Sequence, residues 1–358
     1  MASFDEVLKD CTKLGTKIPT SEYLENGKYP IIDQGQNDIA GYYDSDDGLF
    51  EDVPTIVFGD HTRVVKYVDK PCFLGADGVK LLCPVDKDIN CKYLFYQLSY
   101  ADIPNTGYNR HFKWVKALDF KILSSDEQNH VVEVLDKVTE LISLRKQQLA
   151  KLDELVKARF VEMFENSLWP NTSLNDICSE IVDCPHSTPK YEGNLEHPAI
   201  RTTEIKKGYI DWDSMKYVSE EEYQKRIKSL KPVPGDIVYG REGTYGNAAI
   251  IPDGYEFCLG QRVMLFRPNK TKCISAYVLY AILSDHVKRQ ADEKNVGATV
   301  PHVNVADAKQ FDVVLPPLSI QNQFAAFVER VDQQKQTVQQ SLEKLELMKK
   351  ALMQEYFE

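Results

Sequence analysis

Residues 105–116 hold the densest group of side chains that could bind a phosphate or a nucleobase. They read Asn-Thr-Gly-Tyr-Asn-Arg-His-Phe-Lys-Trp-Val-Lys, with three cations, three aromatic rings and no carboxylate. Cations neutralise phosphates, whereas amide and guanidinium groups hydrogen-bond the edges of bases. The pattern therefore favours contact with a nucleic acid. A solvated loop that Phe112 and Trp114 anchor to a core would have the same composition.

Residues of the same kinds follow expected strands elsewhere in the chain. His61 and Arg63 come after one such strand, where a local turn pairing with Asp60 is the alternative. Residues 240–247 follow another and are rich in glycine, which lets backbone N–H groups approach phosphates closely. Arg241 in this stretch could fork onto guanine, although an ordinary β-turn is the alternative. The candidate contact residues are His61, Arg63, Tyr108, Asn109, Arg110, His111, Lys113, Arg241, Thr244, Tyr245, Asn247, Arg262, His302 and Asn304.

Two long stretches of the chain are copies of one another. Residues 128–165 align with residues 321–358 at a constant offset of 193, and 12 of the 38 aligned positions are identical. An internal repeat of this kind predicts two structural units of the same design. The chain therefore reads as a globular unit, a helix, a second globular unit and a second helix.

Both repeated stretches carry the a/d seam of a coiled coil, with apolar residues at alternating spacings of four and three. No Gly or Pro interrupts either stretch. We expect two helices of about 33 residues, ~50 Å long, that pair antiparallel because a pseudo-two-fold axis would then relate the halves. A generic helical hairpin inside a globular core is the alternative. The expected seam comprises Leu135, Val138, Ile142, Leu149, Leu152, Val328, Val331, Leu342 and Leu345, with Arg159, Met163, Leu352 and Tyr356 near the helix ends.

The rest of the pattern predicts an α+β fold. Apolar runs bounded by turn residues indicate strands, at residues 55–58, 79–82, 236–239, 248–251 and 262–266. Helices that pack on them are expected at residues 92–101 and 275–289. The expected organisation is two mixed α/β domains separated by two long helices that form an antiparallel coiled coil. The domains would span residues 1–122 and 167–314, and the helices residues 123–166 and 315–358.

Composition limits the class of protein. The chain has 358 residues and a net charge of −11, which argues against a non-specific coat on nucleic acid, because such binding depends on excess cation. No signal peptide or membrane span is evident, and eight cysteines over this length suggest reduced thiols. No metal site is expected, because the Cys and His spacing lacks a Cys-x2–4-Cys pair. We expect a cytoplasmic protein that does not bind a membrane.

Five short motifs occur in a fixed order along the chain. They are Tyr-Pro-Ile-Ile-Asp-Gln-Gly-Gln at 29–36, Ile-Val-Phe-Gly-Asp-His-Thr-Arg at 56–63, Pro-Gly-Asp-Ile-Val at 234–238, Gly-Arg-Glu-Gly-Thr-Tyr-Gly at 240–246 and Leu-Pro-Pro-Leu-x-x-Gln at 315–321. Together with the helix repeat, they resemble the specificity subunit of type I restriction–modification systems over the whole chain. Residues 122–128 depart from the last motif, because they keep Glu-Gln and lose the prolines.

The resemblance implies a non-catalytic subunit with two target-recognition domains. Each domain would read one half of a split site in double-stranded DNA, and the helices would set the spacer between the halves. The implied partners are two methyltransferase subunits and, in the full complex, restriction and translocation subunits. S-adenosylmethionine, ATP and Mg²⁺ would be bound by those partners and no cofactor by this chain. The sequence itself lacks the glycine-rich and Asn-Pro-Pro-aromatic motifs of such enzymes.

Two alternatives remain open. The chain could be the specificity subunit of a two-gene, type II-like enzyme that cuts on both sides of its site, which differs from a type I system only in its partner. It could also be a coiled-coil scaffold whose globular domains bind proteins rather than DNA. Deleting such a scaffold would leave DNA methylation unchanged.

Overall fold

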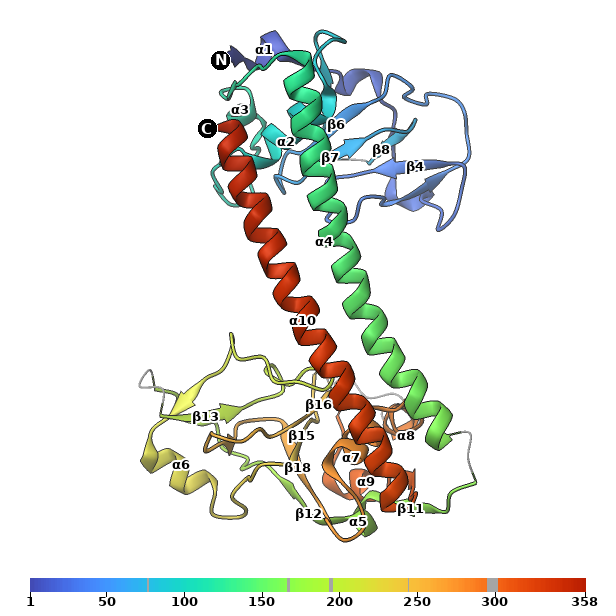
Figure 1. Cartoon of the computed structure of the whole chain (residues 1–358), viewed down its shortest axis with the longest axis vertical. Helices are drawn as coiled ribbons and strands as arrows, with labels where there is room; N and C mark the ends of the chain where they lie inside the picture. The colour runs from blue at the N-terminus through green and yellow to red at the C-terminus, as the bar shows by residue number, and fades with distance from the viewer. Residues whose placement is uncertain (76, 166–167, 193–195, 244, 295–301) are drawn as a thin grey trace. The chain divides into compact units, whose positions relative to one another are not determined.

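The structure, a computed structural model, describes all residues except 76, 166–167, 193–195, 244 and 295–301. It contains two compact units, residues 1–147 with 339–358 and residues 148–338. Two long helices contribute to both units (Figure 1): α4 (Ser125–Phe160), which continues through the π-helical turn η3 (Val161–Glu165), and α10 (Leu318–Phe357). The boundaries expected from the sequence follow the chain, whereas each compact unit takes segments from both helices.

Two four-stranded sheets form the globular domain of the first unit. One is antiparallel, in the order β2 (Leu8–Asp10), β9 (Val79–Pro84), β6 (Thr55–Gly59), β7 (Val65–Val68). The other, in which β8 runs parallel to both neighbours, has the order β3 (Lys17–Ile18), β8 (Phe73–Gly75), β4 (Tyr29–Ile32), β5 (Gly41–Tyr43). The remaining elements are α1 (Phe4–Val7), η1 (Thr12–Leu14), η2 (Thr20–Glu22), α2 (Cys91–Tyr100), α3 (Phe112–Val115) and the pair β1 (Ala2–Ser3) and β10 (Asp119–Phe120).

The second unit repeats this plan. Its antiparallel sheet has the order β12 (Cys178–Asp183), β18 (Val263–Pro268), β15 (Ile237–Gly240), β16 (Ala248–Ile250). Its smaller sheet has the order β14 (Tyr217–Val218), β13 (His197–Ile200), β17 (Cys258–Leu259). The other elements are β11 (Asn171–Ser173) paired with β19 (Asp312–Val314), α5 (Leu174–Ile177), α6 (Glu220–Arg226), α7 (Ser275–Leu283), α8 (Asp285–Lys294) and α9 (Val305–Lys309).

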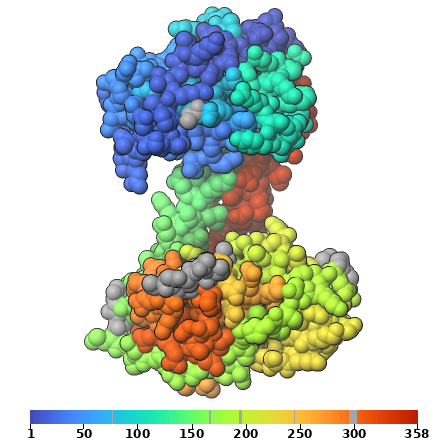
Figure 2. Space-filling view, turned by 180° about the vertical axis from the view of Figure 1, so that it is seen from behind, coloured from blue at the N-terminus to red at the C-terminus, as the bar shows by residue number. Residues whose placement is uncertain are grey.

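The two globular domains therefore share one topology. The order β2–β9–β6–β7 corresponds to β12–β18–β15–β16, and the parallel pair β4/β8 corresponds to β13/β17. In the first domain β1 pairs with β10, so the dark-blue N-terminal residues lie beside teal residues in Figure 2. The pair β11/β19 closes the second domain in the same way. The sequence repeat seen in the helices thus extends to the whole fold.

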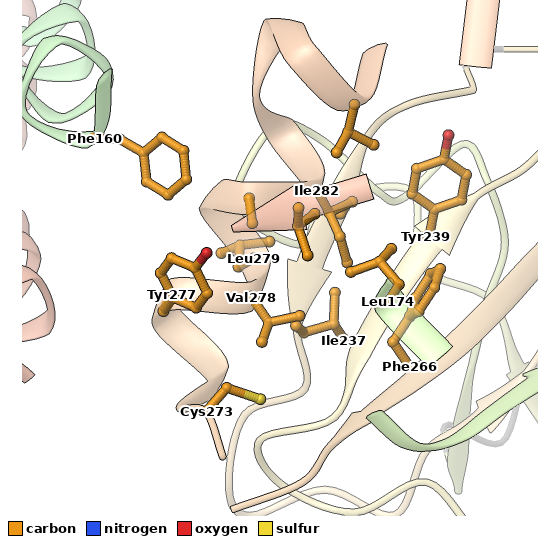
Figure 3. Packing of buried hydrophobic residues seen from close by; sticks show 14 of the residues in the cluster. Phe160, Leu174, Ile237, Tyr239, Phe266, Cys273, Tyr277, Val278, Leu279 and Ile282 are labelled. Carbon is orange, nitrogen blue, oxygen red and sulfur yellow. The ribbon is translucent and has the colours of Figure 1, made fainter. Parts of the chain in front are cut away.

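Burial explains why these apolar runs form strands. All five residues of β6 are buried, and β-branched and aromatic side chains pack well on a buried pleated surface. In the second unit, Figure 3 shows Ile237 and Phe266 of the sheet packed together with Val278 and Ile282 of α7. Each side chain of this size contributes about 1.5–3 kcal/mol when it is fully buried. These cores fix the strand ends from which the connecting loops emerge.

Within each unit the two long helices pair antiparallel. In the first unit Phe357, near the end of α10, shares a cluster with Val131 and Leu135, near the start of α4. In the second unit Phe160, at the end of α4, packs on Phe324, near the start of α10, with ring centroids 5.5 Å apart. The α+β class and the antiparallel pairing that the sequence predicted are confirmed.

The seam positions expected from the heptads face inward over most of the pair. The buried ones are Leu135, Val138, Ile142, Leu152, Val328, Val331 and Leu342, and Leu149 and Leu345 are half-buried. At the helix ends the buried positions move by one residue, to Phe160, Phe164, Met353 and Phe357 instead of Arg159, Met163, Leu352 and Tyr356. The shift occurs because the helix ends pack on a globular domain as well as on the partner helix.

Identical residues of the repeat make equivalent contacts in the two units. Phe164 packs edge-on against Tyr277 of α7 with ring centroids 4.9 Å apart, and Phe357 packs against Tyr93 of α2 at 5.6 Å. Each tyrosine hydroxyl donates to a carbonyl at or just after the end of β19 or β10. Each long helix therefore ends against the globular domain that precedes the other helix.

Two repeated glutamines join the helix starts to the globular domains. Gln128 is buried, and its Oε1 accepts the N–H of Asn90 at 2.9 Å. Gln321 is buried as well, and its Oε1 accepts the N–H of Ile274 at 3.0 Å. In both, Nε2 donates to the carbonyl five residues earlier at 2.8 Å. The start of α4 and of α10 is thereby fixed to the start of α2 and of α7.

All eight cysteines are free and buried. Burial raises the pKa of the Cys72 and Cys91 thiols to about 12. These two thiols are therefore protonated at neutral pH and have little nucleophilic character. No helix among the described residues is both long and apolar enough to cross a membrane.

Candidate nucleic-acid interface

The turn between β6 and β7 is closed by two backbone hydrogen bonds. The N–H of Gly59 donates to the carbonyl of Val64 at 2.8 Å, and the N–H of Arg63 donates to Gly59 at 2.7 Å. Arg63 takes a positive φ of 62° to close the turn, a conformation that most residues other than glycine disfavour. Its guanidinium Nη1 donates to the carbonyl of Ile103 at 2.9 Å. Arg63 therefore joins the turn to the chain that enters the basic-aromatic loop, residues 105–111.

Asp60 connects this turn to two other loops. Its N–H donates to the carbonyl of Gly78, between β8 and β9, at 2.6 Å, and its carbonyl accepts the N–H of His111 at 2.8 Å. Its carboxylate accepts the N–H of Phe112 at 2.8 Å. Asp60 is buried. The carboxylate thus holds the basic-aromatic loop rather than pairing locally with Arg63.

His61 and Tyr108 form a stacked aromatic pair at the surface. Their rings are nearly parallel, with centroids 4.8 Å apart, and Tyr108 is 89% exposed. His61 Nδ1 lies 3.2 Å from the carbonyl of Asn109, and the His61 N–H donates to Oε1 of Gln34 at 3.2 Å. Two separate candidate segments of the sequence therefore meet in one place. The pair presents a flat ring face on which a base or a thymine methyl group could pack.

The remaining candidates of the first domain divide into exposed and buried side chains. Arg110 and Lys113 are exposed. His111 is fully buried, with Nδ1 2.9 Å from the carbonyl of Asp60 and Nε2 3.3 Å from the N–H of Thr106. That His111 contacts a nucleic acid stays a prediction, and such contact would require its buried ring to leave these partners. Its ring holds the loop in shape, and the neighbouring residues of the loop are exposed.

The turn between β15 and β16 in the second domain has the same frame. The N–H of Gly240 donates to the carbonyl of Asn247 at 2.8 Å, and the N–H of Gly246 donates to Gly240 at 3.1 Å. Gly246 has a positive φ of 89°. Gly240 thus corresponds to Gly59, and Gly246 takes the place of Arg63.

Arg241 takes the place of Asp60 in this frame. Its N–H donates to the carbonyl of Arg262, between β17 and β18, at 2.9 Å, and its carbonyl accepts the N–H of Val303 at 2.9 Å. In both domains, the turn after β6 or β15 is therefore joined by the same backbone hydrogen bonds to two other segments. These are the loop between β8 and β9 or between β17 and β18, and the chain that precedes α3 or α9. The side chains that these bonds position differ from one domain to the other.

That Arg241 forks onto guanine stays a prediction, and its guanidinium is paired inside the domain. Its Nη1 lies 2.7 Å from Oδ2 of Asp183, its Nη2 lies 3.5 Å from Oε1 of Glu242, and its side chain is only 14% exposed. Oε2 of Glu242 lies 3.2 Å from Nε of Arg262, whose side chain is 66% exposed. Four side chains of alternating charge thus extend from β12 toward the surface, in the order Asp183, Arg241, Glu242 and Arg262. The exposed arginine of this series is Arg262 rather than Arg241.

Three other candidates of the second domain use their polar atoms inside the domain. The hydroxyl of Tyr245 donates to the carboxylate of Asp292 on α8, a hydrogen bond that raises the pKa of the tyrosine. Nδ2 of Asn247 donates to the carbonyl of Ile205 at 3.1 Å. Asn304 is the N-cap of α9 and accepts a backbone N–H of its first turn at 2.9 Å. That these residues also touch a nucleic acid stays a prediction.

His302 is exposed, and its backbone bridges to Glu242 beside the β15–β16 turn. Thr244 lies outside the described residues. The exposed candidates of both domains are Tyr108, Asn109, Arg110, Lys113, Arg262, His302 and Asn304. Their contact with a nucleic acid likewise stays a prediction.

A family model of the type I restriction modification DNA specificity domain matches residues 5–154 and again residues 167–347. The chain belongs to the family of type I restriction–modification specificity subunits. Each match contains one of the two globular domains, which are therefore its two target-recognition domains.

Two curated specificity subunits of Methanocaldococcus jannaschii are similar in sequence. The type I restriction enzyme MjaX specificity subunit is 28% identical over 217 residues, 59% of this chain and 50% of that protein. This chain thus matches about half the length of that relative. The MjaVIII specificity subunit is 21% identical over 316 residues, 78% of this chain and 74% of that protein.

Two solved structures share the fold. The type I restriction–modification S subunit from M. genitalium superposes with a TM-score of 0.60 at 15% identity, covering 99% of this chain and 95% of that one. A chain from a structure on complex assembly and conformational transition of the type I system gives a TM-score of 0.52 at 15% identity, covering 97% and 96%.

Sequence reasoning missed the acidic and amide residues that hold the loops of this specificity subunit. Asp60 and Gln34 do so in the first target-recognition domain, and Asp183 and Glu242 in the second. Carboxylates are ordinarily set aside in a search for contacts to phosphates, because they repel them. A usable signal existed for Gln34, Asp60 and Glu242, which lie within the motifs at residues 29–36, 56–63 and 240–246, whereas Asp183 lies in none of the five motifs.

Proposed function

We propose that the chain is the DNA-reading subunit of a restriction–modification complex, with one half of a split site read by each target-recognition domain. The observation that carries the proposal is the shared loop frame. Both domains join the same three loops by the same backbone hydrogen bonds, yet they place Asp60, His61 and Tyr108 in one and Arg241, Glu242 and Arg262 in the other. One frame that positions different side chains suits two detectors of different short sequences.

The long helices would fix the distance between the two half-sites and hold the partner subunits. Specificity subunits are non-catalytic, so methyl transfer and cleavage would belong to two methyltransferase subunits and to restriction and translocation subunits. Those partners would bind S-adenosylmethionine, ATP and Mg²⁺, and the complex would act in the cytoplasm. The net charge of −11 fits this division, because the partners would supply part of the cation that DNA binding needs.

A methylation map tests the proposal. The chain is co-expressed with its cognate adenine methyltransferase in a host without DNA methylation, and modified adenines are located across the genome. We expect a split motif of two short half-sites separated by a fixed gap of unread bases. A contiguous motif would contradict the two-detector proposal, and an active methyltransferase that modifies nothing would favour a protein-binding scaffold instead.

Variants of exposed residues in the first target-recognition domain test whether these side chains contact phosphates or bases. Replacing both Arg110 and Lys113 with alanine should weaken methylation by about tenfold or more at moderate salt, because two phosphate contacts are lost. We expect the motif itself to persist. A motif that changes in one half would instead show that these side chains read bases.

A further inference from the structure

Each target-recognition domain places one arginine in a left-handed turn position where the other domain has glycine. Arg63 of the first domain, with φ 62°, corresponds to Gly246 of the second, with φ 89°. Arg262 of the second domain, with φ 60°, corresponds to Gly78 of the first, with φ 66°. The correspondence rests on the backbone, because each pair makes the same hydrogen bond to the residue at or after the end of β6 or β15.

Positive φ is disfavoured for an arginine, since its Cβ crowds the backbone and its side chain offers none of the local hydrogen bonding of Asn or Asp. Such a residue persists where its side chain has a use. Arg63 has a structural use, because its Nη1 donates to the carbonyl of Ile103. Glycine at Gly78 shows that the frame can be closed without a side chain at the position of Arg262.

Arg262 has no comparable structural use in the part of the chain that the structure describes. Its side chain is 66% exposed, and its recorded polar contact is between Nε and Oε2 of Glu242 at 3.2 Å. That contact occupies Nε and leaves the two Nη groups directed to no described partner. A guanidinium that is held through Nε and keeps both Nη groups for a ligand can donate two hydrogen bonds to O6 and N7 of guanine.

We infer that Arg262 reads a guanine in the half-site of the second target-recognition domain, and that Glu242 is its positioning residue. The inference rests on the proposed function and names the base at one position of the site. Glu242 is itself held, because Arg241 lies between it and Asp183 at 3.5 Å and 2.7 Å. The acid would therefore keep the guanidinium oriented before DNA arrives.

The test is a methylation map of complexes that carry the Arg262→Gly variant. Glycine suits the left-handed turn, so the variant should fold at least as well as the parent, with no fall in melting temperature. We expect the first half-site and the spacer to stay unchanged, while one G·C position in the second half-site loses its preference by about 10–100-fold. Arg262→Lys should lose most of the preference as well, because an ammonium keeps the charge without the fork.

Three further variants separate base reading by Arg262 from general charge effects and from structural effects. Arg289→Ala removes an exposed arginine of α8 and should leave the motif unchanged. Glu242→Gln should relax the same base pair as Arg262→Gly, and Glu242→Asp should restore part of the preference. Loss of methylation without a change at that base pair would show that Glu242 has only a structural role.

Outcomes that would overturn the inference are distinct from failure of the proposed function. If Arg262→Gly lowers methylation equally at all sites and keeps the motif, Arg262 contacts a phosphate. If it changes neither rate nor motif, the residue has no part in recognition. If the parent complex gives no split motif at all, the proposed function itself is wrong, and the effect of Arg262 is then not one of half-site reading.

Discussion

At the scale of single residues, the repeat is clearest in two buried glutamines that make equivalent hydrogen bonds. Gln321 is fully buried, and it donates Nε2 to the carbonyls of Pro316 at 2.8 Å and Lys272 at 3.0 Å while accepting the N–H of Ile274 at 3.0 Å. Gln128 has the equivalent role in the first unit. A polar residue is kept in both helix starts because it satisfies backbone groups that neither the helix nor the loop can pair alone.

Replacing Gln321 with leucine should destabilise the second unit by about 2–4 kcal/mol, because the buried groups left without partners lose their hydrogen bonds. The neighbouring Asn322→Ala is a matched control, since Asn322 is also identical in the repeat but is exposed. It should change stability by less than about 0.5 kcal/mol. Hydrogen exchange measures the effect locally, and we expect faster exchange in the first turn of α7 for Gln321→Leu alone. Equal exchange in both variants would show that the glutamine adds nothing there.

At the scale of the helices, Lys335 and Lys349 both occupy positions of the α10 heptad seam, but their surroundings differ. Nζ of Lys335 lies 2.6 Å from Oδ1 of Asp153. Lys349 instead lies over the ring of Tyr96, at 5.7 Å, with no carboxylate at ion-pair distance among the described residues. Burial, and after it the charge of Lys146, lowers the pKa of Lys349 from its usual 10.5.

Lys349→Met should therefore raise the free energy of unfolding by about 1 kcal/mol at neutral pH, through the apolar area that methionine adds to the seam. Lys335→Met should be close to neutral, because it also removes an ion pair. The pH dependence follows from the lowered pKa. At pH values just below 10.5, Lys349 binds fewer protons in the folded chain than in the unfolded chain, so the contribution of this side chain to stability rises with pH through that window.

Urea unfolding at pH 7 and about pH 9.5 measures both effects. The alkaline gain due to this side chain should disappear in Lys349→Met and persist in Lys335→Met. An identical pH dependence in all three proteins would mean that Lys349 is solvated in the folded state.

The helices were also the part of the fold that sequence could predict best. Their heptads and the identical residues at offset 193 gave their number, extent and antiparallel pairing. The buried shift to Phe160 and Phe357 could not be predicted, because it depends on contacts with Tyr277 and Tyr93 in domains distant along the sequence. Heptad spacing describes contacts with a helix and not with a sheet-bearing domain.

The contacts of the loops could be predicted from the sequence less well than those of the helices. Composition indicated two segments that the fold brings together, since His61 and Tyr108 meet in the structure. It did not separate side chains that are exposed to a ligand from side chains that hold the loops in place, because arginine and histidine can have either role. Arg241 and His111 are held inside the protein by groups that come from other segments of the chain. Only the fold shows which arginine of the second domain is directed outward.

At the scale of the whole chain, both long helices are shared by the two compact units. Register within the pair can be read from Lys146, whose Nζ lies 3.0 Å from Oε1 of Glu346. Residues 141–147 and 345–351 are therefore opposite one another, and each is one heptad. Deleting both removes about 10 Å from the helical pair while keeping the seam in phase.

The paired deletion should shorten the unread spacer by about three base pairs, at 3.4 Å per step, and leave both half-sites unchanged. A methylation map of the deleted complex measures this directly. Deleting residues 141–147 alone is the control. It removes Lys146, the partner of Glu346, and leaves seven residues of α10, one heptad, without a counterpart in α4. We expect that protein to be less stable and to direct little methylation. If the paired deletion keeps the original spacer, or changes a half-site instead, the helices do not set the distance between the two detectors.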